Sequence, residues 1–158
     1  MISPLGTSLA TVHQFAKQMF LARGNHPMMV LVATDTEFTH FAPEFDTEED
    51  KGRFVIAMKA LIRDLDVIEY FIICESWSRV ASSVEECEYI DENWDTESPS
   101  CYPPSMCTEM LLTIHATKDG VIESLVSEIN RGDGTLTLTD LDLDKNSAGG
   151  VFATLFQA

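Results

Sequence analysis

The residues best suited to chemistry follow an apolar run in the middle of the chain. Val67–Cys74 leads directly into Glu75, Trp77 and Arg79. A carboxylate held against an indole can have a raised pKa, and such a group serves as a general acid or base. Glu75, Arg79 and His115, the last from a later segment, are therefore the catalytic candidates for a small hydrolase-like enzyme with its site at a strand end.

The same residues have a structural interpretation. Glu75 can pair with Arg79 or Lys118, or accept backbone N–H groups, and then it only terminates the strand. Glu109 opens the next strand along the chain, so nothing in the order of residues supports a carboxylate dyad between it and Glu75. A pair of Cys74 with His115 would depend entirely on the fold, because the two are distant in the sequence.

No other set of residues has the spacing of a metal or cofactor site. The four histidines form no HxH, HxxxH or HExxH pattern, and His13 lies away from the main apolar stripe of its expected helix. The four cysteines lack the close pairs of a zinc site and are expected to be free thiols. Asp140–Val151 resembles a calcium loop, but Lys145 and Val151 stand where glycine and glutamate are needed. We expect no metal and no cofactor.

The charge of the chain is unusual. It has 10 basic and 26 acidic residues, a net charge of −16. Such a field opposes direct binding to nucleic acid and to an anionic membrane. Seven carboxylates lie within residues 85–97, and no basic residue occurs between Arg79 and Lys118. This region is either a solvated surface, a cation-attracting surface, a contact for a basic partner, or a mimic of nucleic-acid charge.

Length and pattern predict a single domain over residues 1–158. No apolar stretch approaches the roughly 20 residues that cross a bilayer, and Met1–Gly6 has no signal-peptide pattern, so a cytoplasmic location is expected. Apolar spacing predicts helices at Ser8–Arg23 and Thr47–Leu65. Runs of apolar or alternating residues predict strands at Met28–Ala33, Thr36–Phe41, Val67–Cys74, Glu109–Thr117, Val121–Ile129 and Thr135–Thr139, and an apolar segment at Val151–Phe156.

A long acidic loop is expected at residues 80–105, with room for a short helix at Val84–Ile90. Two helices are too few to cover both faces of a parallel sheet. The sequence therefore predicts an α+β fold, with both helices packed on one face of a single, mainly antiparallel sheet of five or six strands.

Several short segments resemble a group of small uncharacterised bacterial and phage-associated proteins. The matching pieces are Glu75-Ser76-Trp77, Pro103-Pro104-Ser105, Glu109–Ile114 and Gly149–Phe152, over roughly the second half of the chain. This chain departs from the group in its acidic residues 85–97 and at Cys107-Thr108, where an arginine-bearing stretch is expected. The group has no assigned activity, so the resemblance implies a domain layout and no function.

The leading hypothesis is a non-catalytic, acidic binding domain for a protein partner or for a second copy of itself. Exposed aromatic residues suit the core of such an interface, and Trp77, Tyr89, Trp94 and Tyr102 are the candidates. The hydrolase-like enzyme is the first alternative. A nucleic-acid mimic that binds a basic protein is the second.

Overall fold

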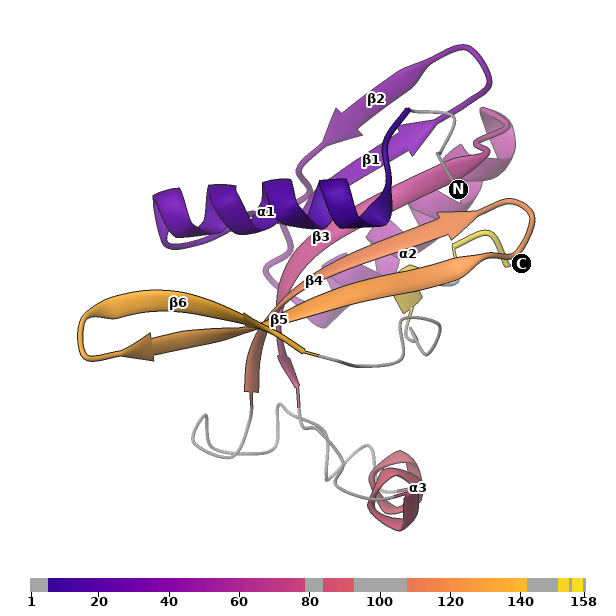
Figure 1. Ribbon diagram of the computed structural model, residues 1–158. Helices are drawn as coiled ribbons and strands as arrows, with labels where there is room; N and C mark the ends of the chain where they lie inside the picture. The colour runs from indigo at the N-terminus through magenta and orange to yellow at the C-terminus, as the bar shows by residue number, and fades with distance from the viewer. Residues whose placement is uncertain (1–5, 79–83, 93–107, 142–150, 154, 158) are drawn as a thin grey trace.

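The computed structural model describes residues 6–78, 84–92, 108–141, 151–153 and 155–157. In this part of the chain six strands form one open sheet in the order β2-β1-β3-β4-β5-β6, and all neighbours are antiparallel (Figure 1). The predicted α+β fold is confirmed. The strands are β1 (Met29–Ala33), β2 (Phe38–Phe41), β3 (Glu69–Ser78), β4 (Thr108–Thr117), β5 (Ile122–Gly132) and β6 (Thr135–Asp140); the helices are α1 (Leu9–Arg23), α2 (Glu48–Asp64), α3 (Val84–Glu92) and the short 3-10 turn η4 (Val151–Ala153).

The two long helices cover opposite faces of the sheet (Figure 1). Tyr70 and Ile72 of β3 are buried on the side of α2, whereas Phe71 and Ile73 are buried on the side of α1. Successive residues of a strand point to opposite faces, so a strand that is apolar at four consecutive positions needs a cover on each side. The expectation that both helices share one face is corrected by this packing.

α1 begins and ends where its sequence predicts. The Ser8 hydroxyl caps the helix by accepting a hydrogen bond from the Thr11 N–H at 3.2 Å. Gly24 ends it with a φ of 79°, and its N–H donates to the Phe20 carbonyl at 2.7 Å. A left-handed residue at this position suits glycine, which has no Cβ to clash.

α2 is capped at Thr47 and ends in a tight turn at Asp66. Asp66 has a φ of 53°, and its N–H donates to the Arg63 carbonyl. The next N–H, that of Val67, donates to the Ile62 carbonyl at 3.0 Å, and both side chains belong to the same apolar core. This pairing of the last carbonyls with a hydrophobic contact is the Schellman arrangement. It returns the chain directly from α2 into β3.

β3 is longer than the apolar run predicts. It continues through Ser78 and pairs residue by residue with β4, from Glu69 opposite Thr117 to Ser78 opposite Thr108. Glu75 therefore lies inside the strand and not after its end. Within the long loop expected at residues 80–105, the described part is a helix, α3.

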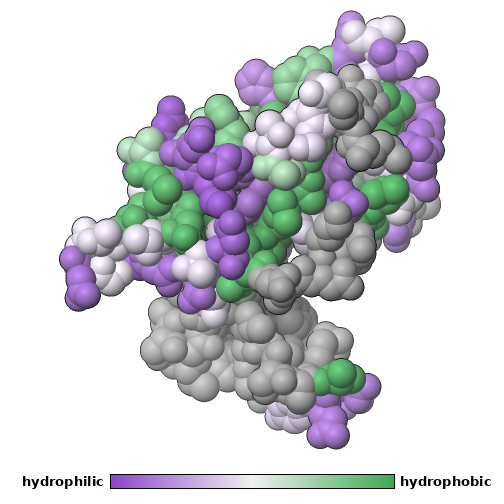
Figure 2. Space-filling model, in the orientation of Figure 1, coloured by the Kyte–Doolittle hydropathy of each residue, from purple (hydrophilic) through white to green (hydrophobic). Residues whose placement is uncertain are grey.

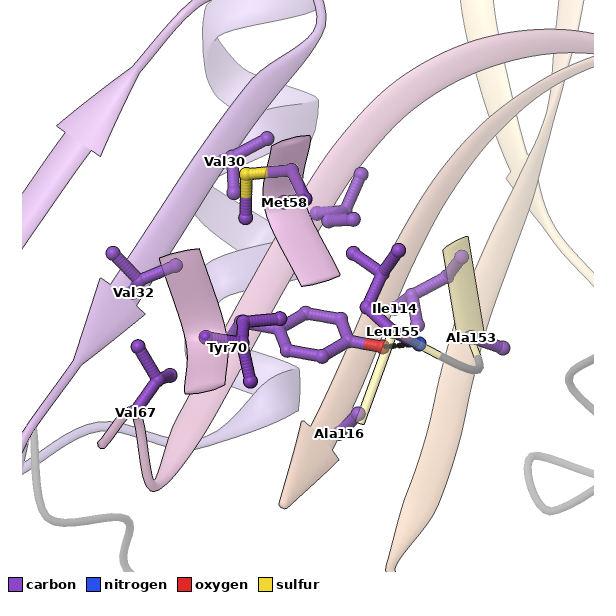
Figure 3. Packing of buried hydrophobic residues seen from close by; sticks show 11 residues of the cluster. Val30, Val32, Met58, Val67, Tyr70, Ile114, Ala116, Ala153 and Leu155 are labelled. Atoms are coloured by element: carbon purple, nitrogen blue, oxygen red, sulfur yellow. Dashed lines mark hydrogen bonds between the residues drawn. The ribbon is translucent and has the colours of Figure 1, made fainter. Parts of the chain in front are cut away.

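The C-terminal segment is held on the α2 face by Tyr70 (Figure 3). The buried Tyr70 hydroxyl donates to the Phe152 carbonyl at 2.7 Å and accepts from the Leu155 N–H at 3.2 Å. Burial raises the pKa of Tyr70 to about 12, so the hydroxyl keeps its proton near neutral pH. Ala153 and Leu155 complete the core beside it.

Substituting Tyr70→Phe tests this attachment. The change removes one hydroxyl and leaves a buried carbonyl and a buried N–H without their partner, so the free energy of unfolding should fall by about 1–3 kcal/mol. Urea denaturation measures the loss, and hydrogen exchange of the Leu155 N–H should accelerate more than exchange in β5. An unchanged free energy would show that the hydroxyl does not anchor the segment.

Candidate functional site

Glu75 lies on the face of the sheet that carries α1, half-buried near the end of that helix. Its Oε1 accepts a hydrogen bond from the backbone N–H of His26 at 2.6 Å. His26 is buried in the connection from α1 to β1. Glu75 thus follows the structural interpretation, in which its carboxylate accepts a backbone N–H group. It fastens the α1–β1 connection to β3.

Arg131 is the cation of a polar cluster formed with Glu109, the Gly24 carbonyl and Glu75. Its guanidinium donates to both oxygens of Glu109 at 2.9 and 3.0 Å, and also to the Gly24 carbonyl at 3.3 Å. The same group lies 5.5 Å from the centre of the Phe20 ring. The hydrogen bonding of the Arg131 guanidinium to Glu109, together with the negative charges of Glu109 and Glu75, raises the pKa of Arg131. Glu75 and Glu109 therefore surround a common cation, and they do not share a proton as a dyad would.

His115 lies at the other end of the same face. Its Nε2 is 3.1 Å from Oε2 of Glu69, which is almost fully buried, and its ring stacks on Phe71 at 4.3 Å. Glu75 is opposite Leu111, four positions along β4 from His115, which places the two roughly 13 Å apart along the strand. Arg79 lies outside the described residues. The structure does not bring Glu75 and His115 into one pocket.

Cys74 and His115 cannot form a catalytic pair. Cys74 has the strand parity of Tyr70 and Ile72, on the α2 side, whereas His115 stacks on Phe71 on the α1 side. Burial raises the pKa of the Cys74 thiol to about 11, so it is protonated at neutral pH and a poor nucleophile. The expected free thiol is confirmed for Cys74. Cys101 and Cys107 lie outside the described residues, as does the Cys87 side chain.

His13, which the sequence places away from the apolar stripe of its helix, is buried. It lies between α1 and the sheet, with Nδ1 2.7 Å from the Thr113 hydroxyl and Nε2 2.8 Å from the Ser127 hydroxyl. The Ser127 hydroxyl donates to Asp140 at 2.7 Å, and Lys17 donates to the same carboxylate at 2.8 Å. A polar chain thus leads from the buried Thr113 to the exposed Asp140.

The directions of these hydrogen bonds follow from the carboxylate, which only accepts. Since the Ser127 hydroxyl gives its proton to Asp140, its oxygen accepts from the Nε2–H of His13. The unprotonated Nδ1 then accepts from Thr113, and His13 is neutral. Desolvation, and next the charge of Lys17, lower the pKa of His13 from 6.5 to about 4, against the opposing charge of Asp140. Both ring nitrogens of His13 have a partner, so the network fixes the position of α1 on the sheet.

The sequence offered only a weak signal for this network. Thr113 and Ser127 interrupt otherwise apolar strand positions, and both are fully buried. A buried hydroxyl in a strand requires a partner. His13 is that partner, one position beside the apolar stripe of its helix.

The expected aromatic binding residues lie mostly beyond the described part of the chain. Trp94 and Tyr102 lie outside it, as does the side chain of Trp77, whose backbone pairs with Glu109. Tyr89 is on α3 and 50% exposed. A different aromatic pair is accessible on the body of the protein: Phe38, 52% exposed, stacks on His40 in β2 with ring centres 6.0 Å apart.

β2 is an edge strand with a backbone edge that no described element pairs (Figure 1). The Thr34 N–H donates to the Glu37 carbonyl at 2.9 Å, which makes these two a hydrogen-bonded pair at the turn. Bonded and non-bonded pairs alternate along an antiparallel ladder, so Thr39 and Phe41 bond to β1. The N–H and carbonyl groups of Phe38 and His40 consequently point outward.

The sequence on both sides of β2 is acidic. Between Arg23 and Lys51 the chain has no basic residue and seven carboxylates: Asp35, Glu37, Glu44, Asp46, Glu48, Glu49 and Asp50. The tip of the β1–β2 hairpin, at the top of Figure 2, is hydrophilic, and apolar residues on the visible face form separate patches. β2 itself, Phe38–Phe41, has no charged residue and no proline, the features that normally block an edge.

The His13 network predicts a pH dependence of stability. Between pH 6.5 and 4 the unfolded chain binds a proton at His13 that the folded protein does not bind, so the free energy of unfolding falls as the pH falls through this window. The loss is on the order of 3 kcal/mol, and none of it occurs above pH 7. The pKa of Asp140 is lowered below 3.8, so its contribution is lost only at more acid pH.

Urea denaturation across this pH range checks the prediction with wild type and His13→Gln. Glutamine cannot take up the proton, so the variant should be less stable at pH 7 but have a flatter profile between pH 6.5 and 4. Parallel profiles would contradict a neutral, buried His13.

Comparison with known proteins gives no match to this chain. No protein-family model matches the chain, and neither a curated protein nor a solved structure matches it. The resemblance carried by Glu75-Ser76-Trp77 stays a prediction.

Among the described residues, no helix has the length and apolar content to cross a membrane, and no group of three or more histidine, cysteine or acidic side chains is placed to hold a metal ion. The outward edge of β2 is the candidate functional site.

Proposed function

We propose that this chain is a non-catalytic binding domain that takes up an extended, basic segment of a partner protein along β2. The observation that carries the proposal is the outward edge of β2, with the backbone groups of Phe38 and His40 directed away from β1. An extended peptide can add to such an edge as a further strand, and its main-chain hydrogen bonds supply affinity.

The side chains of β2 suit the same partner. Phe38 and His40 offer a stacked, exposed aromatic surface on one side of the strand, where alternate apolar side chains of an added strand would pack. β6, the opposite edge of the sheet, has no aromatic residue in its sequence. The aromatic pair therefore favours β2 over β6 as the binding edge.

Charge selects a basic partner over a second copy of the chain. Two copies paired edge to edge would bring Glu37 and Glu44 of each copy together, in addition to the repulsion between net charges of −16. A segment with lysine or arginine at either end of an apolar core would instead place opposite charges beside these carboxylates. Such exposed pairs contribute mainly to the rate and specificity of association.

A designed peptide tests the proposal directly. The probe is a short peptide of alternating valine and threonine with lysine at both ends, and its control has glutamate in place of lysine. NMR titration should show binding of the basic peptide at low salt, with slower hydrogen exchange of the Phe38 and His40 N–H groups. The acidic peptide should bind at least about tenfold more weakly.

Two matched pairs of variants separate backbone from charge. His40→Pro removes an outward N–H and leaves the bonds to β1 intact, so it should weaken the basic peptide about tenfold, while His40→Ala, which keeps the N–H, should retain more of the affinity. Glu37→Gln with Glu44→Gln should lower affinity severalfold at low salt, whereas Asp119→Asn with Asp133→Asn, the same charge change in distant turns, should not.

Clear results would contradict the proposal. Binding that protects amides elsewhere and leaves Phe38 and His40 unaffected would exclude β2 as the site. A concentration-dependent dimer that His40→Pro abolishes would show that the edge serves self-association.

A further inference from the structure

A pocket at the end of α2 gathers cations in this otherwise acidic protein. It has a volume of about 370 Å³, within the range of small-molecule sites. Its charged lining comes from Lys59 and Arg63 in the last turns of α2, Asp66 in the following turn, and Lys118 between β4 and β5. Three of the ten basic residues of the chain thus meet one carboxylate in a single hollow.

The rest of the lining is apolar. Ile62, Val67 and Leu155 are buried in the core on the α2 side and form part of the lining. Figure 3 labels Val67 and Leu155 near Tyr70. Phe156 adds an aromatic surface, with its ring packed 5.2 Å from that of Tyr70. The two hydrogen bonds of the Tyr70 hydroxyl, one donated to the Phe152 carbonyl and one accepted from the Leu155 N–H, hold this wall in place.

The cations are available to a ligand. Lys118 pairs with Asp66, and Arg63 pairs with Asp64 at 3.1 Å, but all four side chains are more than half exposed. Exposed ion pairs of this kind contribute roughly 0–1 kcal/mol and exchange readily for another anion. The Lys59 side chain is half-buried, and it makes no hydrogen bond or ion pair with the residues that the structure describes.

We propose that this pocket binds a small monocarboxylic acid with an apolar body. The carboxylate would lie between Lys59, Lys118 and Arg63, and an aryl or alkyl group would cover the buried floor and contact Phe156. A single negative charge fits better than a phosphate dianion, because the net charge of −16 repels a dianion about twice as strongly. This inference is independent of the function proposed for β2.

The experiment is an NMR titration of the whole chain with 4-phenylbutyrate at low salt, against its neutral isostere 4-phenylbutyramide. The acid should shift the backbone amide signals of residues 59–67, 118 and 155–157, and the amide should bind about tenfold more weakly. Equal affinity for acid and amide would reduce the pocket to an apolar hollow and overturn the proposal, as would shifts confined to other residues or no shifts at all.

A pair of variants on α2 tests the role of the lysine. Lys59→Gln should weaken 4-phenylbutyrate about threefold to tenfold, whereas Arg53→Gln, the same charge change in an exposed residue nearer the start of the helix, should leave affinity within about twofold. Circular dichroism confirms the fold of both. Equal effects of the two variants would mean that net charge, and not the pocket, governs binding.

A second ligand distinguishes a free small acid from the C-terminal carboxylate of a peptide as the natural ligand. N-acetylphenylalanine carries the same ring and charge on a peptide-like backbone, as the C-terminus of a protein would. If it binds more tightly than 4-phenylbutyrate, the natural ligand is a peptide C-terminus; the reverse order assigns the pocket to a free small acid.

Discussion

Burial of β3 on both faces is the constraint on which this structure depends. Tyr70, Phe71, Ile72 and Ile73 are all at most 1% exposed, although they alternate between the two faces of the sheet. Each such side chain stabilises the fold by about 1.5–3 kcal/mol only if its own face is covered. One helix on each side is therefore required. The α2 side also needs the C-terminal segment, because α2 does not cover the β4 end of that face alone.

The cover on the α1 side is fixed by polar contacts as much as by apolar ones. His13 and Lys17 connect the middle of the helix to β4, β5 and β6, while Arg131 and Glu75 hold its end and the chain that follows. Apolar contacts tolerate sliding, whereas a fully satisfied hydrogen-bond network has one geometry. Of the three catalytic candidates from the sequence, Glu75 contributes to this cover, by accepting the His26 N–H just after α1.

Much of the fold could be predicted because helix and strand periods are local properties. The caps at Ser8 and Thr47 and the hairpin at Asp133-Gly134 depend on neighbouring residues alone. The face that each helix covers is not local: a stripe of apolar residues shows which side is buried but not against what. The length of β3 was missed for the same reason, since Glu75–Ser78 is a strand only because β4 pairs with it.

The sites were harder to predict because their residues are distant in the chain. His13 meets partners 100 and 114 residues away, and its place away from the main apolar stripe gives no sign of them. Arg131 lies beside the turn from β5 to β6, yet it joins Glu109 and Gly24, which are 22 and 107 residues away. The outward edge of β2 follows from the register with β1, which begins at the Thr34–Glu37 turn. Strand order and register bring these distant residues together, and neither can be predicted from one segment of the sequence alone.

The attachment of residues 152–155 to Tyr70 has a consequence for the order in which the fold is completed. A chain is made from its N-terminus, so β1, α2 and β3 leave the ribosome long before Ala153 and Leu155 exist. Until then the Tyr70 hydroxyl lacks both of its partners, and the apolar surface beside it stays open to water. The sheet can assemble during synthesis, but its α2 face closes only when Ala153 and Leu155 have been added.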